Sequence, residues 1–184
     1  LGLELRNPLI VGSSGLTDSV DKIVELEKYG AGAVVLKSIF EEEIRMEYEH
    51  VLEEEAPSRY KDDYLDYFDY KIKERNVTKY IKLIADTKKK VKIPVIASIN
   101  CTSSYEWTYY TKKIEEAGAD ALELNIYILP STLDKTIDEI EQTYLEIISM
   151  VKGETNMPVS IKISCFFSNL ARAIKQLSKT GVDG

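Results

Sequence analysis

Short apolar runs recur along the chain and alternate with amphipathic stretches of helical length. The runs lie at residues 8–11, 33–36, 95–99, 121–124 and 159–163. They are rich in β-branched residues and mostly continuous, which is typical of strands covered on both faces in a parallel sheet. The segments between them carry apolar residues at helical spacing, most regularly over 137–151. Strand and helix therefore alternate, so neighbouring strands need crossover connections.

A glycine turn repeats between helix and strand. Gly30, Gly118 and Gly181 each follow an amphipathic stretch, where a left-handed residue ends a helix. The third turn lies at residues 180–184, so we expect a further strand beyond it, because a full barrel takes about 250 residues. The sequence predicts an α/β fold, a (β/α)8 TIM barrel present as roughly its first five strand–helix units, in one domain over 1–184. An open doubly wound sheet is the alternative.

One segment, at about residues 40–76, departs from this alternation. It is rich in glutamate, aspartate and tyrosine, and its apolar residues near Ile44 keep helical spacing. In a barrel it would rise from the face that carries active sites, because it follows the second strand. We interpret it either as a lid or subunit contact, the latter consistent with a homodimer, or as a solvated excursion.

Composition narrows the class of protein. The net charge of -7 with 30% charged residues argues against nucleic acid or an anionic membrane as the main partner. No apolar run approaches the roughly 20 residues that span a bilayer, and no signal-peptide pattern is present. The two cysteines, Cys101 and Cys165, form no CxxC or Cys/His pattern. We therefore expect a cytoplasmic protein without a metal site.

Small and polar residues gather where the predicted strands end. They are Gly12, Ser13, Ser14, Lys37, Ser38, Asn100, Asn125 and Lys162. The carboxyl ends of barrel strands form the face that carries chemistry. A lysine within a buried strand is costly unless it meets an anion or acceptor, although both lysines could instead extend to the rim. Such a set suits a flat, electron-poor ring that forms hydrogen bonds.

The order of these segments resembles a known family. Residues 1–10, followed by Gly12-Ser13-Ser14-Gly15, resemble the opening of dihydroorotate dehydrogenases. Residues 35–38 are similar to that family's strand with a flavin-contacting lysine. Residues 96–101 and 117–125 resemble the flavin domain of dihydropyrimidine dehydrogenase and its dihydroorotate relatives. The resemblance runs over nearly the whole chain.

The resemblance implies an FMN-dependent oxidoreductase of pyrimidine biosynthesis that oxidises dihydroorotate to orotate, or acts on a related dihydropyrimidine. The family's flavin contacts fall on Gly12, Ser13, Ser14, Lys37, Ser38, Asn100, Asn125 and Lys162. Lys37 and Asn125 would also contact substrate. Lys162 would lie beside the flavin N1 and C2 oxygen and stabilise the charge left by reduction. The resemblance puts the phosphate-binding residues beyond residue 184.

One position departs from the family. Three residues after the equivalent of Asn125, relatives carry a cysteine or serine that removes the substrate proton, and this chain has Ile128. Isoleucine cannot act as a base, so Ser131 is our candidate, with Tyr127 and the two cysteines as further alternatives. The alternative functions are a flavin-binding barrel without dihydroorotate activity, a flavin-free binding protein that has lost its chemistry with its base, and a phosphate-binding barrel isomerase or synthase.

Overall fold

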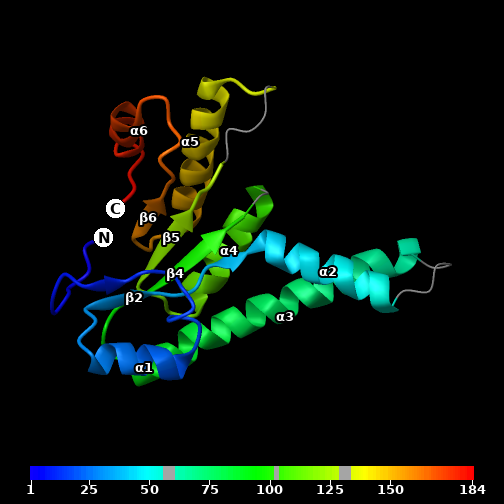
Figure 1. Cartoon of the computed structure of the whole chain (residues 1–184), viewed down its shortest axis with the longest axis horizontal. Helices are drawn as coiled ribbons and strands as arrows, with labels where there is room; N and C mark the ends of the chain where they lie inside the picture. The colour runs from blue at the N-terminus through cyan, green and yellow to red at the C-terminus, as the bar shows by residue number, and fades with distance from the viewer. Residues whose placement is uncertain (56–60, 102–103, 129–133) are drawn as a thin grey trace.

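The strands of this computed structural model form one parallel sheet. The structure describes residues 1–55, 61–101, 104–128 and 134–184. Its strands are β1 (Ile10–Val11), β2 (Ala33–Val35), β3 (Ile39–Phe40), β4 (Val95–Asn100), β5 (Ala121–Asn125) and β6 (Val159–Lys162). They lie in the order β1-β2-β4-β5-β6, with β3 also beside β4 (Figure 1). Every pairing is parallel. Chain order and sheet order agree, as in a barrel, whereas a doubly wound sheet reverses direction. The predicted partial (β/α) barrel is confirmed.

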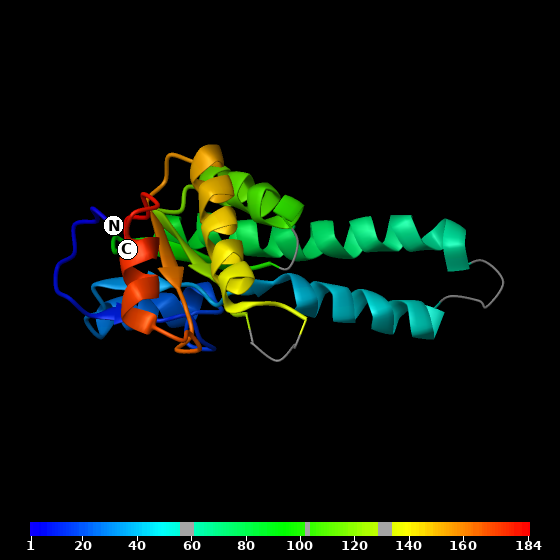
Figure 2. The same ribbon diagram turned by 90° about the horizontal axis from the view of Figure 1, so that it is seen from above.

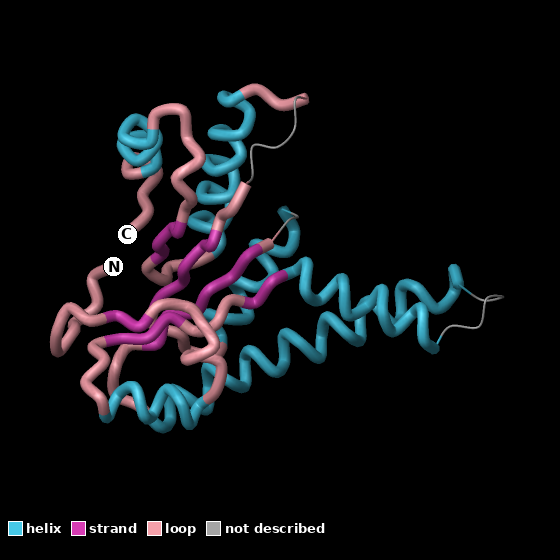
Figure 3. Tube along the Cα trace, viewed as in Figure 1, coloured by secondary structure: helices cyan, strands magenta, loops and turns pink. Residues whose placement is uncertain are grey.

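Helices flank the sheet and connect its strands (Figure 3). They are α1 (Val20–Lys28), α2 (Glu41–Glu55), α3 (Lys61–Lys90), α4 (Ser104–Glu116), α5 (Ile137–Glu154) and α6 (Leu170–Leu177). The acidic segment predicted at 40–76 forms α2 and the first half of α3, which project together as a long helical hairpin (Figure 2). Its role as lid, subunit contact or solvated excursion stays a prediction. None of the helices in the described part of the chain is long and apolar enough to cross a membrane.

The two faces of the sheet differ in chemistry. Side chains of one parity, such as Ala97, Leu122 and Leu124, belong to the main core, which includes the buried residues of the helices. Side chains of the other parity face the barrel interior. Near the start of the strands these are Val35, Ile96 and Ala121, packed against Leu1 and Leu3. The interior face is therefore apolar at its base, and the residues further along each strand decide its function.

A bulge interrupts the second predicted strand, which we expected over residues 33–38. Val35 lies opposite Ile96, whereas Ile39 lies opposite Ile99, so this side has one extra residue. Leu36 still donates its N–H to the Ile96 carbonyl on β4, but the next two N–H groups bond to the loop after β1: Lys37 donates to the Thr17 carbonyl and Ser38 to the Ser13 hydroxyl. The structure thus divides this strand into β2, a bulge and β3.

A tyrosine from α3 fills the gap that the bulge leaves. The Tyr80 hydroxyl accepts a hydrogen bond from the Ser98 N–H at 2.8 Å and donates to the Ser98 carbonyl at 3.0 Å. Both backbone groups of this fully buried serine are thereby satisfied. Burial raises the pKa of Tyr80, so the hydroxyl keeps its proton and serves as both donor and acceptor.

The repeated glycine turns are confirmed and share further contacts. The three glycines all have positive φ: Gly30 at 101°, Gly118 at 84° and Gly181 at 84°. Two residues after the second and third glycine comes an aspartate. The Asp120 carboxylate accepts the Val95 N–H at 2.7 Å, and the Asp183 carboxylate accepts the Val159 N–H at 2.9 Å. In each turn the aspartate also donates its N–H back to the same residue's carbonyl. Each turn therefore fixes the start of the preceding strand.

Candidate functional site

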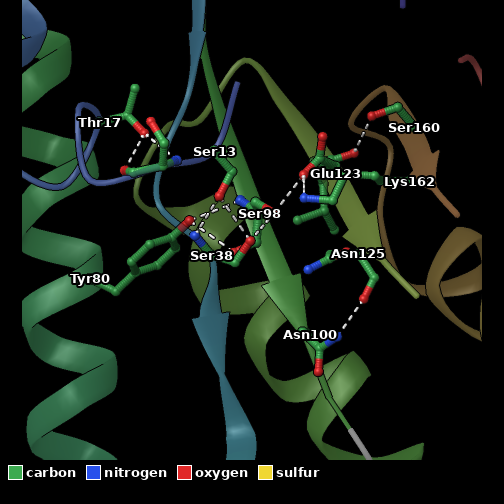
Figure 4. A network of polar contacts seen from close by, with 12 residues as sticks. Ser13, Thr17, Ser38, Tyr80, Ser98, Asn100, Glu123, Asn125, Ser160 and Lys162 are labelled. Carbon is green, nitrogen blue, oxygen red and sulfur yellow. Dashed lines mark hydrogen bonds and ion pairs between the residues drawn. The ribbon is translucent and has the colours of Figure 1, made fainter. Parts of the chain in front are cut away.

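Polar residues occupy the interior face above its apolar base. Ser98 on β4 lies opposite Glu123 on β5, which lies opposite Ser160 on β6. One step further toward the carboxyl ends, Asn125 lies opposite Lys162, and Asn100 ends β4. The close-up view shows these side chains extending from neighbouring strands (Figure 4). Of the polar strand ends predicted from the sequence, Asn100, Asn125 and Lys162 thus share one face.

The asparagines form the upper part of this face. The Asn100 amide donates to the Asn125 backbone carbonyl at 2.7 Å, which holds the ends of β4 and β5 together. The Asn125 side chain is half-buried, and within the described residues its amide forms no hydrogen bond. Half-buried amides usually have partners. The Asn125 amide is thus available to a ligand as both donor and acceptor.

Glu123 is the residue that the sequence interpretation missed. Its Oε1 accepts a hydrogen bond from the Ser98 hydroxyl at 2.7 Å and lies 3.1 Å from the Lys162 ammonium. The Glu123 side chain is 14% exposed, whereas that of Lys162 is 45% exposed. The signal was present in the sequence: Glu123 and Asn125 share parity in a strand whose other residues are apolar. Lys162 therefore meets an anion, as a lysine in such a strand requires.

Two predicted serines connect to this pair through hydroxyl groups. The Ser38 hydroxyl lies 2.7 Å from that of Ser98 and 3.0 Å from that of Ser13. A continuous series of polar contacts therefore runs from the loop after β1, across the bulge, to β4, β5 and β6 (Figure 4). It links Ser13, Ser38 and Lys162, three residues predicted to contact a cofactor, with two that were not predicted.

The rest of the loop after β1 leaves space beside the sheet. Gly12 is exposed, and a Cβ built on it would meet no described atom within 4 Å. Ser14 instead stabilises its own turn, because its N–H donates to the Thr17 hydroxyl and its hydroxyl accepts from the Leu16 N–H. A flat ligand could therefore approach the backbone at Gly12, while the Ser14 side chain serves the loop.

Lys37 lies apart from these contacts. It is exposed at the bulge and lines a cavity of about 290 Å³ together with Asp18 and with residues of α2 and α3 that include Glu47 and Asn76. The Lys37 charge contributes to lowering the pKa of Asp18, after the larger contribution of Lys22. Among the predicted lysines, the structure joins Lys162 to the interior network. The convergence of Lys37 with it stays a prediction.

The candidates for the catalytic base differ in how buried they are and in what surrounds them. Ile128 is half-buried and packs against the main core, and Tyr127 is 55% exposed, with its ring edge-on to Phe166 at 6.2 Å between centroids. Ser131 lies outside the described residues. Cys101 is buried, and burial raises the pKa of its thiol, with Glu41 and Glu106 adding to the effect. A thiol in this setting keeps its proton at neutral pH and is a poor base. Cys165 is exposed.

Comparison with known proteins extends these observations. The chain is 28% identical over 181 residues to the catalytic subunit of dihydroorotate dehydrogenase B (NAD(+)) from Thermoplasma volcanium. The match covers 97% of this chain and 57% of the relative, so the chain spans little more than half of that protein's length. No family model matches the chain.

Solved structures support the fold. Phosphonopyruvate hydrolase, in complex with oxalate and Mg²⁺, is 14% identical with a TM-score of 0.55, and the match covers 95% of this chain and 56% of the hydrolase. Dihydrodipicolinate synthase from Agrobacterium tumefaciens is 15% identical with a TM-score of 0.55, covering 92% and 50%. The synthase from Aquifex aeolicus is 13% identical with a TM-score of 0.52, covering 93% and 50%. At these identities the likeness shows a shared barrel fold and nothing of their chemistry.

Proposed function

We propose that this chain is part of an FMN-dependent oxidoreductase of the dihydroorotate dehydrogenase type, which acts on dihydroorotate or a related dihydropyrimidine. The observation that carries the proposal is the interior layer of Asn100, Asn125 and Lys162, in a chain with 28% identity over 181 residues to such an enzyme. The similarity to that relative reaches along the chain and includes the strands that carry this layer.

The donor set of this layer fits a flavin ring. The edge of the ring carries alternating hydrogen-bond donors and acceptors, and amides offer both. The Asn125 amide has no hydrogen-bond partner among the described residues, and Gly12 faces open space at the neighbouring loop. Lys162 supplies a cation, which the nearby Glu123 holds in place. We propose that Gly12, Ser13, Ser38, Asn100, Asn125 and Lys162 hold the ring, with Lys37 contributing if the bulge turns it toward the same face.

We propose the following roles for the residues of this site. FMN held by these residues would supply the acceptor for the hydride that leaves the substrate carbon. Asn100 and Asn125 orient ring and substrate, because their strand ends are tied together by a hydrogen bond. Lys162 places positive charge where negative charge grows during the reaction. The proton that leaves the neighbouring substrate carbon needs a base from the loop after β5, for which Ser131 is our candidate.

The proposal is tested by expressing the full-length protein and identifying what it binds. We expect it to be isolated with FMN, or to take up added FMN, and we expect its bound flavin to be reduced by dihydroorotate without oxygen. The variant Lys113→Met, which breaks an exposed ion pair on α4, is the matched control and should retain FMN. A colourless protein that binds no added FMN would overturn the proposal.

A second candidate is a flavin protein of the same fold that does not oxidise dihydroorotate at the usual rate. It is favoured by Ile128, an apolar residue packed into the core at the position of the family's base. Loss of a positioned base slows proton transfer by roughly 10²–10⁴-fold. Ile128→Cys should then raise the rate of dihydroorotate turnover by up to this factor, while Ile128→Ala, which also shortens the side chain but adds no thiol, should not. Rapid turnover by the unmodified protein that survives Ser131→Ala and Tyr127→Phe would rule this candidate out.

A further inference from the structure

Glu123 occupies a position that needs explanation. It lies in the middle of β5, between Leu122 and Leu124, which are fully buried on the opposite face. Its own side chain is 14% exposed. A carboxylate removed from water to this extent is costly unless its charge is compensated. The compensation comes from the Lys162 ammonium at 3.1 Å on one neighbouring strand and from the Ser98 hydroxyl at 2.7 Å on the other.

The hydroxyl groups beside Glu123 have a fixed direction. Ser98 donates its only hydroxyl proton to the Glu123 carboxylate, so in its contact with Ser38 it must accept. Ser38 then has no proton left for Ser13 and accepts from it. Ser13 in turn accepts the Ser38 N–H. Every hydroxyl in the series therefore points its proton toward Glu123, which fixes the direction of the hydrogen bond that holds its carboxylate.

We infer that Glu123 is a positioning residue for Lys162. Glu123 holds the Lys162 ammonium on the interior face and offsets its charge, and the Ser13–Ser38–Ser98 series holds the Glu123 carboxylate in place. This inference rests on the proposed function where it concerns flavin, because the same pair would then set how strongly the site prefers reduced over oxidised FMN. Lys162 alone would favour the reduced, more negative ring, and Glu123 would moderate that preference.

The first experiment needs no flavin. Acetylation of lysines by a sulfo-N-hydroxysuccinimide ester is followed at each lysine by mass spectrometry in the full-length protein without FMN. In Glu123→Gln, which preserves the shape of the side chain and removes its charge, Lys162 should react about twofold to fivefold faster relative to exposed Lys37. Glu116→Gln, which removes the anion of the exposed Lys113–Glu116 pair at 3.5 Å, should leave the Lys162 rate unchanged. Equal Lys162 rates in Glu123→Gln and the unmodified protein would overturn the inference.

The second experiment measures the reduction potential of bound FMN by spectroelectrochemistry. Removing the carboxylate charge in Glu123→Gln should favour reduced FMN by about tenfold, which is about 30 mV upward for a two-electron couple. Lys162→Met should shift the potential downward, and Glu116→Gln should not shift it. A potential that is unchanged in Glu123→Gln while Lys162→Met lowers it would overturn the moderating role. If the unmodified protein bound no FMN, the proposed function would fail, while faster acetylation in Glu123→Gln would still support the positioning of Lys162.

Discussion

Two lysine–glutamate pairs, Lys73 with Glu106 and Lys162 with Glu123, differ in what surrounds them. Lys73 on α3 reaches Glu106 on α4, with side-chain exposures of 21% and 12%. Its ammonium also lies over the rings of Tyr105 and Tyr109, 5.2 and 4.7 Å from their centroids. The Lys162 side chain, at 45% exposure, has no such cover from the described residues. The first pair fastens the helical hairpin to the barrel, and the second presents charge on the face where we place the ligand.

The contrast teaches that an ion pair's surroundings indicate its role better than its distance does. Removing Lys73 from the first pair leaves a carboxylate that is largely shielded from water, which is destabilising. Removing the half-exposed Lys162 from the second pair costs less, because Glu123 keeps its hydrogen bond from the Ser98 hydroxyl. Replacing Lys73 should therefore mainly lower the stability of the fold, and replacing Lys162 should mainly change the properties of the bound ligand.

The largest effect should come from Lys73→Met, which removes the cation that faces Glu106 and lies over two tyrosine rings. We expect it to lower the free energy of unfolding by about 3 kcal/mol, measured by urea denaturation. Lys113→Met, on the exposed face of α4, should change it by less than about 0.5 kcal/mol. If Lys73→Met lowered the free energy of unfolding no more than Lys113→Met does, the proposed difference between the two ion pairs would be wrong.

The next largest effect concerns the contacts of Ser98. Its hydroxyl bonds to Glu123 on the interior face, and its backbone bonds to Tyr80 on α3. Tyr80→Phe removes the one hydroxyl that satisfies both the N–H and the carbonyl of buried Ser98. We expect a loss of about 2 kcal/mol in unfolding free energy. Tyr29→Phe, at a tyrosine that is 87% exposed, is the control. If Tyr80→Phe unfolded like this control, the hydroxyl would not be what completes the bulge.

Lys162→Met should cost less than either change, because this lysine is partly solvated and Glu123 keeps its hydrogen bond from Ser98. We expect less than about 1 kcal/mol in the same denaturation assay. Its effect should appear instead in the reduction potential of bound flavin. A stability cost equal to that of Lys73→Met would show that the pair on the interior face is structural.

The smallest effect concerns Asp183, whose side chain is 39% exposed. The hydrogen bond from the Val159 N–H is the largest cause that lowers the pKa of the Asp183 carboxyl group, and the hydrogen bond from Lys152 is the second. A carboxyl with a lowered folded-state pKa stabilises the fold above its ordinary pKa of about 3.9. That contribution is lost as pH falls through the lower folded-state value. Asp183→Asn should therefore reduce the acid sensitivity of unfolding below about pH 4, as measured by thermal melts from pH 7 to pH 3. Superimposable pH profiles would contradict the assignment.

The fold could be predicted because each barrel unit repeats the same local signals. The apolar runs at 95–99 and 121–124 became β4 and β5, and Gly118 adopts the left-handed conformation expected after a helix. Such signals act over a few residues, so a single sequence contains them. The bulge could not be predicted in this way. It depends on N–H groups at Lys37 and Ser38 that bond to a loop about 20 residues earlier in the chain.

The candidate site was predicted in part for the same reason. Parity along β5 and β6 places Asn125 and Lys162 on one face, as expected for strand ends. Glu123 was missed because its parity in β5 shows only that it shares a face with Asn125, whereas its partner Lys162 depends on the neighbouring strand. Lys37 was predicted to converge on the site, but the bulge adds one residue to its strand. Ser38 therefore lies beside Ser98 in place of Lys37. Register between strands, rather than residue type, decided both cases.

The most direct test of the central claim is an equilibrium titration of the full-length protein with FMN, followed by the change in visible flavin absorbance. The comparison is between the unmodified protein, Asn125→Ala on the interior face, and Asn156→Ala at an exposed position before β6. We predict saturable binding by the unmodified protein and by Asn156→Ala, and affinity weakened about tenfold in Asn125→Ala because a buried hydrogen bond to the ring is lost. Equal affinities in all three, or no binding in any, would contradict the claim that this layer holds the flavin.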